Sequence, residues 1–193
     1  MSNIITLTTD FGISDAYVAS MKGIILNLNP KAKIVDICHN ISPQSVSQAA
    51  FVLDTAYLFF PKKTIHLVVV DPGVGTERQA IILRTPVADF VAPDNGVLSY
   101  VIERYLDEKA GKEGETKAKL NNDAEAVAIT NERFLHKPVS TTFHGRDVFA
   151  PAAAALSLGF LPVEFGQRLA SLEVLPLPRP AICPGGGLVG HIV

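Results

Sequence analysis

Cysteine is scarce in this 193-residue chain, which contains only Cys38 and Cys183. Neither residue has a CxxC partner, and two cysteines are too few for a disulfide framework. A zinc site needs more ligands at closer spacing. The two residues are therefore predicted to be simple buried or surface thiols, and no metal site is expected.

Long apolar runs and stripes of positive charge are missing as well. No apolar run approaches the roughly 18 residues of a membrane helix, and the N-terminal "MSNIITLTTDFG" lacks the basic region and apolar core of a signal peptide. The net charge is −2, and no Lys/Arg stripe with interleaved aromatic residues suggests binding to a phosphate backbone. We therefore expect a soluble cytoplasmic protein with neither a membrane nor a nucleic acid as partner.

Hydrophobic residues make up 48% of the chain, enough to bury the core of one substantial domain. Short β-branched runs alternate with patterns typical of helices. Strands are expected over residues 4–8, 33–37, 64–70, 80–84, 90–92 and 125–130. Helices are expected over 16–28, over 45–59 with Ser45 as N-cap, after the turn "PDNG", and from "HGRDVFAPAAAALSLG" to a stop at Gly159. This alternation predicts an α/β fold with a mostly parallel central sheet flanked by helices.

Two segments depart from this alternation. Residues 107–123 are charged and poor in large apolar side chains, so we expect a solvated excursion without chemistry. The stretch "PLPRPAICPGGG", residues 176–187, has the composition of a linker, and "LVGHIV", residues 188–193, reads as a strand with nothing to pair with. The expected organisation is an α/β domain over residues 1–175, a linker over 176–187 and the start of a truncated C-terminal β domain over 188–193.

Two acids occupy equivalent positions behind expected strands. Asp10 follows the first strand in "TLTTDFG", and Asp71 follows the most apolar strand in "VVVDPGVGTER". The carboxyl ends of parallel strands meet at one edge of a sheet, where ligands of α/β proteins bind. A carboxylate at this edge can stay charged while a rigid element holds it in place. An alternative stays open, in which Asp71 only caps its own turn.

A further candidate region is "STTFHGRDVFAP", which places His144 and Asp147 at the start of a helix that follows a strand. The amino end of a helix has free N–H groups and a positive dipole end, and both favour anions and ligands. Taken alone, His144 could equally be a helix cap or a core histidine, and "PDNG" is an ordinary turn. None of these motifs is specific by itself.

In combination, five segments of the sequence resemble one enzyme family. They are, in chain order, "TLTTDFGISDAYVASMKG", "VDICHNISPQSV", "VVVDPGVGTER", "APDNGVLS" and "TFHGRDVFAPAAA". Together they are similar to the S-adenosyl-L-methionine hydroxide adenosyltransferases, which are adenosine-forming hydrolases of S-adenosylmethionine (SAM). The superfamily also contains the fluorinase and the chlorinase. The resemblance extends from residue 4 to about residue 190.

The resemblance implies roles for individual residues. Asp71, Arg78 and His144 match the set that positions and activates a water molecule in the family. Asp10 matches the acid that holds the ribose hydroxyls, and Asp15 matches an acid near the methionine portion. The expected substrate-binding set is completed by Asn95, Phe143 and Gly145.

The resemblance also separates hydrolysis from halogenation. In the halogenating relatives the positions of Asp71 and His144 carry tyrosines, and that of Gly145 carries a halide-contacting serine. This sequence has none of the three, so water rather than halide is the expected nucleophile. The position of Gln44 is an aromatic residue that packs on the substrate in the fluorinase, and that contact is not implied here.

The implied reaction is the hydrolysis of SAM to adenosine and methionine by attack of water on the ribose 5′ carbon. Methionine leaves as a neutral thioether, so the leaving group needs no acid, and neither a metal nor a cofactor is expected. Aligning water with carbon can lower the barrier by up to roughly 7–11 kcal/mol, and a base adds about 10²–10⁴-fold. Arg78 would orient Asp71, and either Asp71 or His144 would accept the proton.

Family members continue into a smaller β-barrel domain and assemble as trimers with sites between subunits. The resemblance therefore implies a homotrimer, and the barrel domain is expected to be essentially absent from this chain. Two other functions stay open. One is a non-catalytic module that binds SAM or adenosine, and the other is a halide-using SAM adenosyltransferase.

Overall fold

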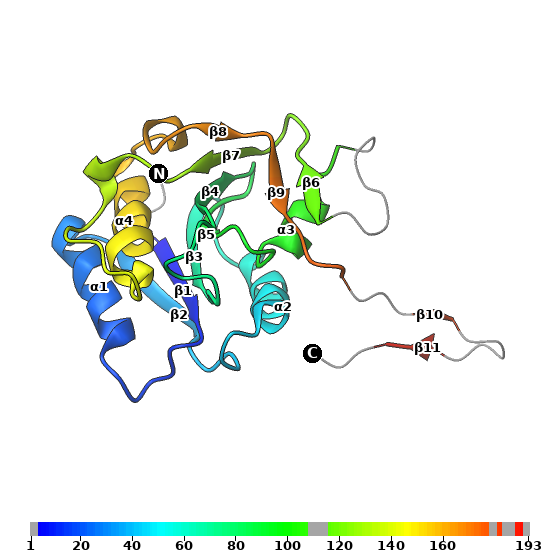
Figure 1. The fold of residues 1–193 in the computed structure, drawn as a ribbon, viewed down its shortest axis with the longest axis horizontal. Helices are drawn as coiled ribbons and strands as arrows, with labels where there is room; N and C mark the ends of the chain where they lie inside the picture. The colour runs from blue at the N-terminus through cyan, green and yellow to red at the C-terminus, as the bar shows by residue number, and fades with distance from the viewer. Residues whose placement is uncertain (1–3, 108–115, 178–180, 183–187, 191–193) are drawn as a thin grey trace.

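The computed structural model describes residues 4–107, 116–177, 181–182 and 188–190. Its centre is a seven-stranded sheet with the strand order β2-β1-β3-β5-β4-β7-β8 (Figure 1). The strands are β1 Ile4–Thr9, β2 Lys33–Cys38, β3 Thr64–Val69, β4 Ala80–Arg84, β5 Ala88–Pro93, β7 Glu125–Ala128 and β8 Arg168–Leu169. Each expected strand is therefore present, and β8 is an additional strand that the sequence pattern did not indicate.

The central sheet is mixed. Strands β2, β1, β3 and β5 are parallel to one another, whereas β4, β7 and β8 join through antiparallel pairs. The predicted α/β fold with a helix-flanked central sheet is confirmed, but parallel pairing is limited to one half of the sheet. The reason lies in the chain between β4 and β5, a tight turn closed by a Thr85 N–H to Ala88 C=O bond of 2.9 Å. Such a turn permits only an antiparallel neighbour, because a parallel one needs a crossover connection.

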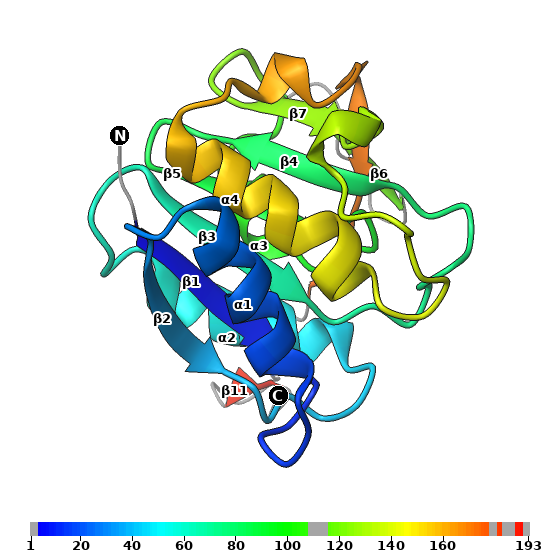
Figure 2. The same ribbon diagram turned by 90° about the vertical axis from the view of Figure 1, so that its left-hand side faces the viewer.

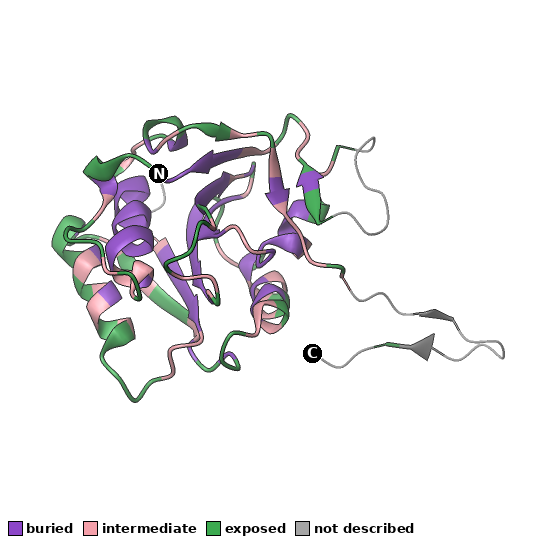
Figure 3. Ribbon diagram, viewed as in Figure 1, coloured by how far each residue is buried: buried purple, intermediate pink, exposed green. Residues whose placement is uncertain are grey.

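Helices cover both faces of the sheet. Their bounds are α1 Tyr17–Leu28, α2 Val46–Tyr57, α3 Ser99–Glu103 and α4 Ala150–Leu158. Helices α1 and α4 pack on one face, and α2 and α3 pack on the other (Figure 2). Strand β3 is buried along its whole length, with Leu67 in the first core and Val68 in the second (Figure 3). Its near-continuous apolar run follows from having both faces covered.

Two helix starts need comment. Ser45 occupies the N-cap position of α2, as expected, although its side chain makes no capping hydrogen bond. The segment of His144 does not directly follow a strand, because the 3₁₀ turn η1 (Glu132–Phe134) and a loop separate it from β7. A π-helical turn, η2 (Gly145–Phe149), then leads into α4. Gly159 ends α4 in the left-handed conformation with φ 102°, as expected, and the 3₁₀ turn η3 (Pro162–Glu164) follows.

Two small antiparallel pairs correct the expectations for the charged and C-terminal segments. Strand β6 (Lys117–Lys119) pairs with β9 (Ser171–Glu173), and Ala118 is buried between its exposed lysines. The segment 107–123 is therefore not wholly solvated, since one small residue among charges is enough to pack. Strand β11 (Leu188–Val189) pairs with β10 (Ala181–Ile182), inside the predicted linker. The expectation that it has nothing to pair with was wrong, while the three proposed domain boundaries stay predictions.

The middle of β3 also contains a fully buried histidine. His66 Nδ1 lies 2.8 Å from Thr6 Oγ1 of β1. Its ring stacks on Phe90 at 5.2 Å between centroids and meets Tyr57 edge-on at 5.9 Å. Burial lowers the pKa of His66 to about 4. The imidazole is therefore neutral near pH 7.

Candidate active site

The carboxyl ends of β1 and β3 lie side by side, because these parallel neighbours pair with Thr9 opposite Val69. Asp10 and Asp71 follow these ends, and both line a cavity of about 330 Å³. The predicted placement of the two carboxylates at one edge of the sheet is confirmed. His144 lines the same cavity and comes from the segment before α4.

The loop after β3 depends on two glycines to fold back on itself. Gly75 has φ 77°, and a Cβ there would lie 2.5 Å from the backbone oxygen of Thr141. A Cβ on Gly73 would lie 3.0 Å from Cγ of Arg78. Glycine at these two positions lets the loop approach residue 141 and lets the arginine turn towards the end of β3. The motif "DPGVGTER" therefore brings a guanidinium to a carboxylate.

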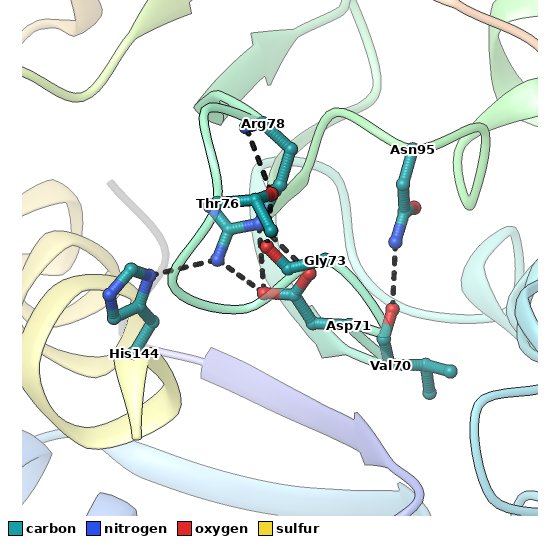
Figure 4. Close-up of polar contacts among 7 residues, drawn as sticks. All are labelled: Val70, Asp71, Gly73, Thr76, Arg78, Asn95 and His144. Atoms are coloured by element: carbon teal, nitrogen blue, oxygen red, sulfur yellow. Dashed lines mark hydrogen bonds and ion pairs between the residues drawn. The ribbon is translucent and has the colours of Figure 1, made fainter. Parts of the chain in front are cut away.

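Arg78 holds Asp71 through two of its nitrogens (Figure 4). Its Nε donates to Oδ1 at 2.8 Å and to Oδ2 at 2.9 Å, and its Nη2 donates to Oδ2. Only 10% of the arginine side chain and 5% of the aspartate side chain are exposed. The ring of Phe149 lies beneath the guanidinium, 5.1 Å from Cζ. A planar donor in a shielded site fixes the direction of the carboxylate as well as its distance.

The same arginine also contacts His144, with Nη2 2.9 Å from Nδ1 (Figure 4). A guanidinium can only donate, so Nδ1 accepts and the proton of the neutral ring lies on Nε2. Burial and the positive charge of Arg78 lower the pKa of His144, against an opposing effect of Asp71 and Asp147. The structure therefore brings together the acid, the guanidinium and the imidazole that the sequence proposed, and the imidazole is neutral.

The segment that presents His144 is anchored by Asp147. This fully buried carboxylate accepts from Arg146 Nε at 2.6 Å and Nη2 at 2.9 Å. It also accepts the N–H of Ser140 at 2.8 Å. Asp147, which belongs to the same motif, therefore holds the loop and turn on either side of His144.

Asp10 is oriented by the segment that follows β2. Its Oδ2 accepts the backbone N–H of Gln44 at 2.8 Å. Gln44 adopts a left-handed conformation with φ 64°, which is uncommon for a residue with a side chain. Both residues line the cavity. One edge of the Asp10 carboxylate is therefore fixed before any ligand arrives.

The remaining predicted residues fall in different places. Gly145 lines the cavity, and Phe143 lies behind it, packed edge-on against Phe11 at 5.8 Å and Tyr17 at 5.0 Å between ring centroids. Asp15 is exposed and does not line the cavity. Asn95 is also outside it: its Nδ2 donates to the Val70 carbonyl at 2.9 Å (Figure 4). Asn95 thus braces the residue before Asp71.

Several cavity residues were not singled out from the sequence. They are Phe11, Tyr17, Pro43, Val69, Val74 and Thr142. Phe11 and Tyr17 stand within seven residues of Asp10 in one motif, so their position in the chain could have indicated them. Val74 and Thr142 carry no such signal, because only the folding of two distant loops brings them to the cavity.

Within the described part of the chain, no group of three or more His, Cys, Asp or Glu side chains is arranged to hold a metal ion. Cys38 is a half-buried free thiol, and Cys183 lies outside the described residues. None of the helices described has the length and apolar character needed to cross a membrane.

Comparison with known proteins establishes the family to which this chain belongs. The family model described as "SAM hydroxide adenosyltransferase N-terminal domain" matches residues 5–166, and the chain belongs to this family. It is 39% identical over 180 residues to the (R)-S-adenosyl-L-methionine hydrolase of Salinispora tropica, covering 93% of this chain and 63% of that protein. The hydrolase of the same name from Methanocaldococcus jannaschii is 42% identical over 159 residues, covering 80% and 53% respectively. A fluorinase of Nocardia brasiliensis is 27% identical over 215 residues, covering 98% and 66%.

The fold is also similar to a crystal structure. An uncharacterized conserved protein from Thermotoga maritima matches with a TM-score of 0.80 and 39% identity, covering 97% of this chain and 71% of that one. The chain spans 63% and 53% of the length of the two hydrolases described above.

Proposed function

We propose that the protein hydrolyses SAM to adenosine and methionine. The observation that carries this proposal is the hydrogen-bonded chain Asp71–Arg78–His144 at a cavity that also contains Asp10. The hydrolase names of relatives at 39% and 42% identity support the same reaction.

In the proposed step, the water oxygen forms a bond to the ribose 5′ carbon while the bond from that carbon to sulfur breaks. The electron pair stays on sulfur, which becomes the neutral thioether of methionine. Asp71 accepts the proton that water loses. His144 is not the acceptor in this arrangement, because its Nδ1 is occupied by Arg78 and its Nε2 carries a proton. Its Nε2–H instead orients the water. Arg78 holds the Asp71 carboxylate and the His144 ring in position through its hydrogen bonds to both.

The substrate is held by the other residues of the proposal. Asp10, already oriented by Gln44, binds the ribose hydroxyls. Asp15 lies towards the methionine portion. Phe143 packs behind Phe11 and Tyr17, the two aromatic residues that line the cavity. Asn95 contributes by bonding to Val70, the residue before Asp71. Gly145 has no side chain, so the substrate can approach the backbone beside His144.

The geometry at Gly145 disfavours a halide-using enzyme. A Cβ there would lie 3.2 Å from Sδ of Met21 and 3.2 Å from Cε2 of Phe11. A serine at this position would therefore fit only if these two side chains shifted by a few tenths of an ångström. Water is the nucleophile that fits the residues present.

The wider setting of the reaction is part of the same proposal. We propose that the reaction needs no cofactor, that SAM is its substrate, and that the protein is cytoplasmic and has no nucleic-acid partner. The proposal also includes a homotrimer with sites between subunits, an α/β catalytic domain over residues 1–175, a linker over 176–187 and the beginning of a β domain over 188–193.

Incubating the complete gene product with SAM in H₂¹⁸O tests the reaction. We expect adenosine and methionine in equal amounts, with the label in the 5′ hydroxyl of adenosine and no 5′-halogenated product when chloride or fluoride is added. Asp71→Asn should lower kcat by at least 10²-fold while adenosine still binds, and Asp123→Asn on the surface serves as the matched control. Tight binding of SAM without turnover would instead identify a binding module.

A further inference from the structure

A buried histidine that the proposed reaction does not use lies directly after β2. His39 is only 7% exposed. The pairing of β1 with β2 shifts register between Leu7, opposite Asp36, and Thr8, opposite Cys38. One residue of β2 is therefore extra, as in a β-bulge, and bulges commonly redirect side chains near functional sites. The shift brings His39 beside Thr9, the last residue before Asp10.

The side chain of His39 connects Thr9 to a charged group on the other side. Its Nδ1 lies 2.9 Å from Thr9 Oγ1, and its Nε2 lies 3.1 Å from Asp36 Oδ1. Lys22 of α1 donates to Asp36 Oδ2 at 2.6 Å. Burial alone would raise the pKa of Asp36, but Lys22 and the neighbouring imidazole of His39 hold it below its ordinary value. His39 Nε2 approaches this carboxylate without hydrogen-bond geometry, so the hydrogen-bonded partner of the ring is the Thr9 hydroxyl at Nδ1.

The backbone of His39 holds the same turn. Its carbonyl accepts the N–H of Gly12 at 2.8 Å, while Thr9 Oγ1 accepts the N–H of Phe11 at 3.3 Å. The turn after β1 is thus tied to His39 on both sides of Phe11. This turn carries Asp10 and Phe11, and both line the cavity.

We propose that His39 is a positioning residue that fixes the Asp10 turn for binding the ribose end of the substrate. The inference rests on the proposed function for the identity of the ligand, but the fixing of the turn can be measured without any ligand. Because Asp10 binds rather than reacts, loosening its turn weakens ground-state and transition-state binding together. KM therefore rises while kcat stays nearly constant.

The sheet contains a matched control for this contact. Thr6 and His66 form the same hydroxyl-to-imidazole pair, with Thr6 Oγ1 2.8 Å from His66 Nδ1. Thr6 and Thr9 are both fully buried in β1, but Thr6 is three residues further from the strand end. Thr9→Val and Thr6→Val remove the same hydroxyl from the same strand.

The experiment compares the two variants in the complete gene product. Thr9→Val should raise KM for SAM and the Kd for adenosine about tenfold, with kcat within threefold of wild type. Exchange of the amide hydrogens of Phe11 and Gly12 should accelerate at least tenfold. Thr6→Val should lower thermal stability similarly and change none of these quantities. His39→Asn, which can keep an acceptor near Thr9, should recover part of the affinity lost in His39→Leu.

Two results would overturn the inference. One is a Thr9→Val protein that is folded, with KM, Kd and amide exchange all unchanged. The other is an equal effect of Thr6→Val on these quantities. If the wild-type protein neither hydrolyses SAM nor binds adenosine, the proposed function fails, and the amide exchange of Phe11 and Gly12 in His39→Leu still decides whether His39 holds the turn.

Discussion

Acidification is expected to destabilise this protein through His66. The pKa of the buried imidazole is about 4, against an ordinary value of 6.5. In the range between these values the unfolded chain binds a proton that the folded protein excludes. The stabilising effect of a neutral His66 is therefore complete above pH 6.5 and is lost as the pH falls through 4. Linkage gives a loss of roughly 1 kcal/mol at pH 5.5 and roughly 2 kcal/mol at pH 4.5.

The assay is urea unfolding of wild type and His66→Asn at pH 7.5, 5.5 and 4.5. The asparagine does not titrate and offers an amide group to Thr6, which contacts His66 at 2.8 Å. The absolute stability of the variant is expected to be lower at pH 7.5, because the aromatic packing around the ring is lost. The decisive quantity is the pH slope, which should be shallower in the variant by about 2 kcal/mol across this range. Equal slopes would refute the assignment of a buried, neutral histidine.

Three further predictions concern Asp94, Gly75 and Arg78. Burial raises the pKa of Asp94 to about 6, so its stabilising effect is complete at low pH and is lost as the pH rises through 6. Asp94→Asn should therefore raise the free energy of unfolding at pH 7.5 by about 1–2 kcal/mol and leave it unchanged at pH 4, and equal stabilities at pH 7.5 would contradict this. Gly75→Ala should lower Tm and kcat more than Gly12→Ala lowers them, because both glycines have positive φ but only at Gly75 would the methyl meet backbone, at 2.5 Å; similar losses would exclude the clash. Arg78→Lys should lower kcat about 10²-fold, since a lysine cannot bond the carboxylate and the imidazole in one plane, and an activity within threefold of wild type would remove that geometry from the mechanism.

The elements of the fold were largely predictable from local patterns. The near-continuous apolar run of β3 indicated a strand covered on both faces, and two helical layers cover it. The parallel pairing of β1 with β3 then placed Asp10 and Asp71 at one edge. Segments with weak hydrophobic patterns were harder to predict. Strand β6 has a single buried alanine between two lysines, and it forms because β9 pairs with it.

The connections within the site were beyond local reasoning. Arg78 and His144 are 66 positions apart, and no periodicity relates them. Their proposed partnership came from the resemblance to a family rather than from the residues themselves. The role inferred for His39 depends on a one-residue register shift between β1 and β2, which hydrophobic alternation does not reveal.

The π-helical turn before α4 makes the site sensitive to chain length. It adds a residue to the turn between His144 and the regular helix. Deleting one residue from this turn would restore ordinary helical spacing and rotate His144 by about 100° around the axis. The imidazole would then face away from Arg78, although Asp71, Arg78 and His144 would all still be present. The length of this turn is therefore as important to the geometry of the site as the three side chains themselves.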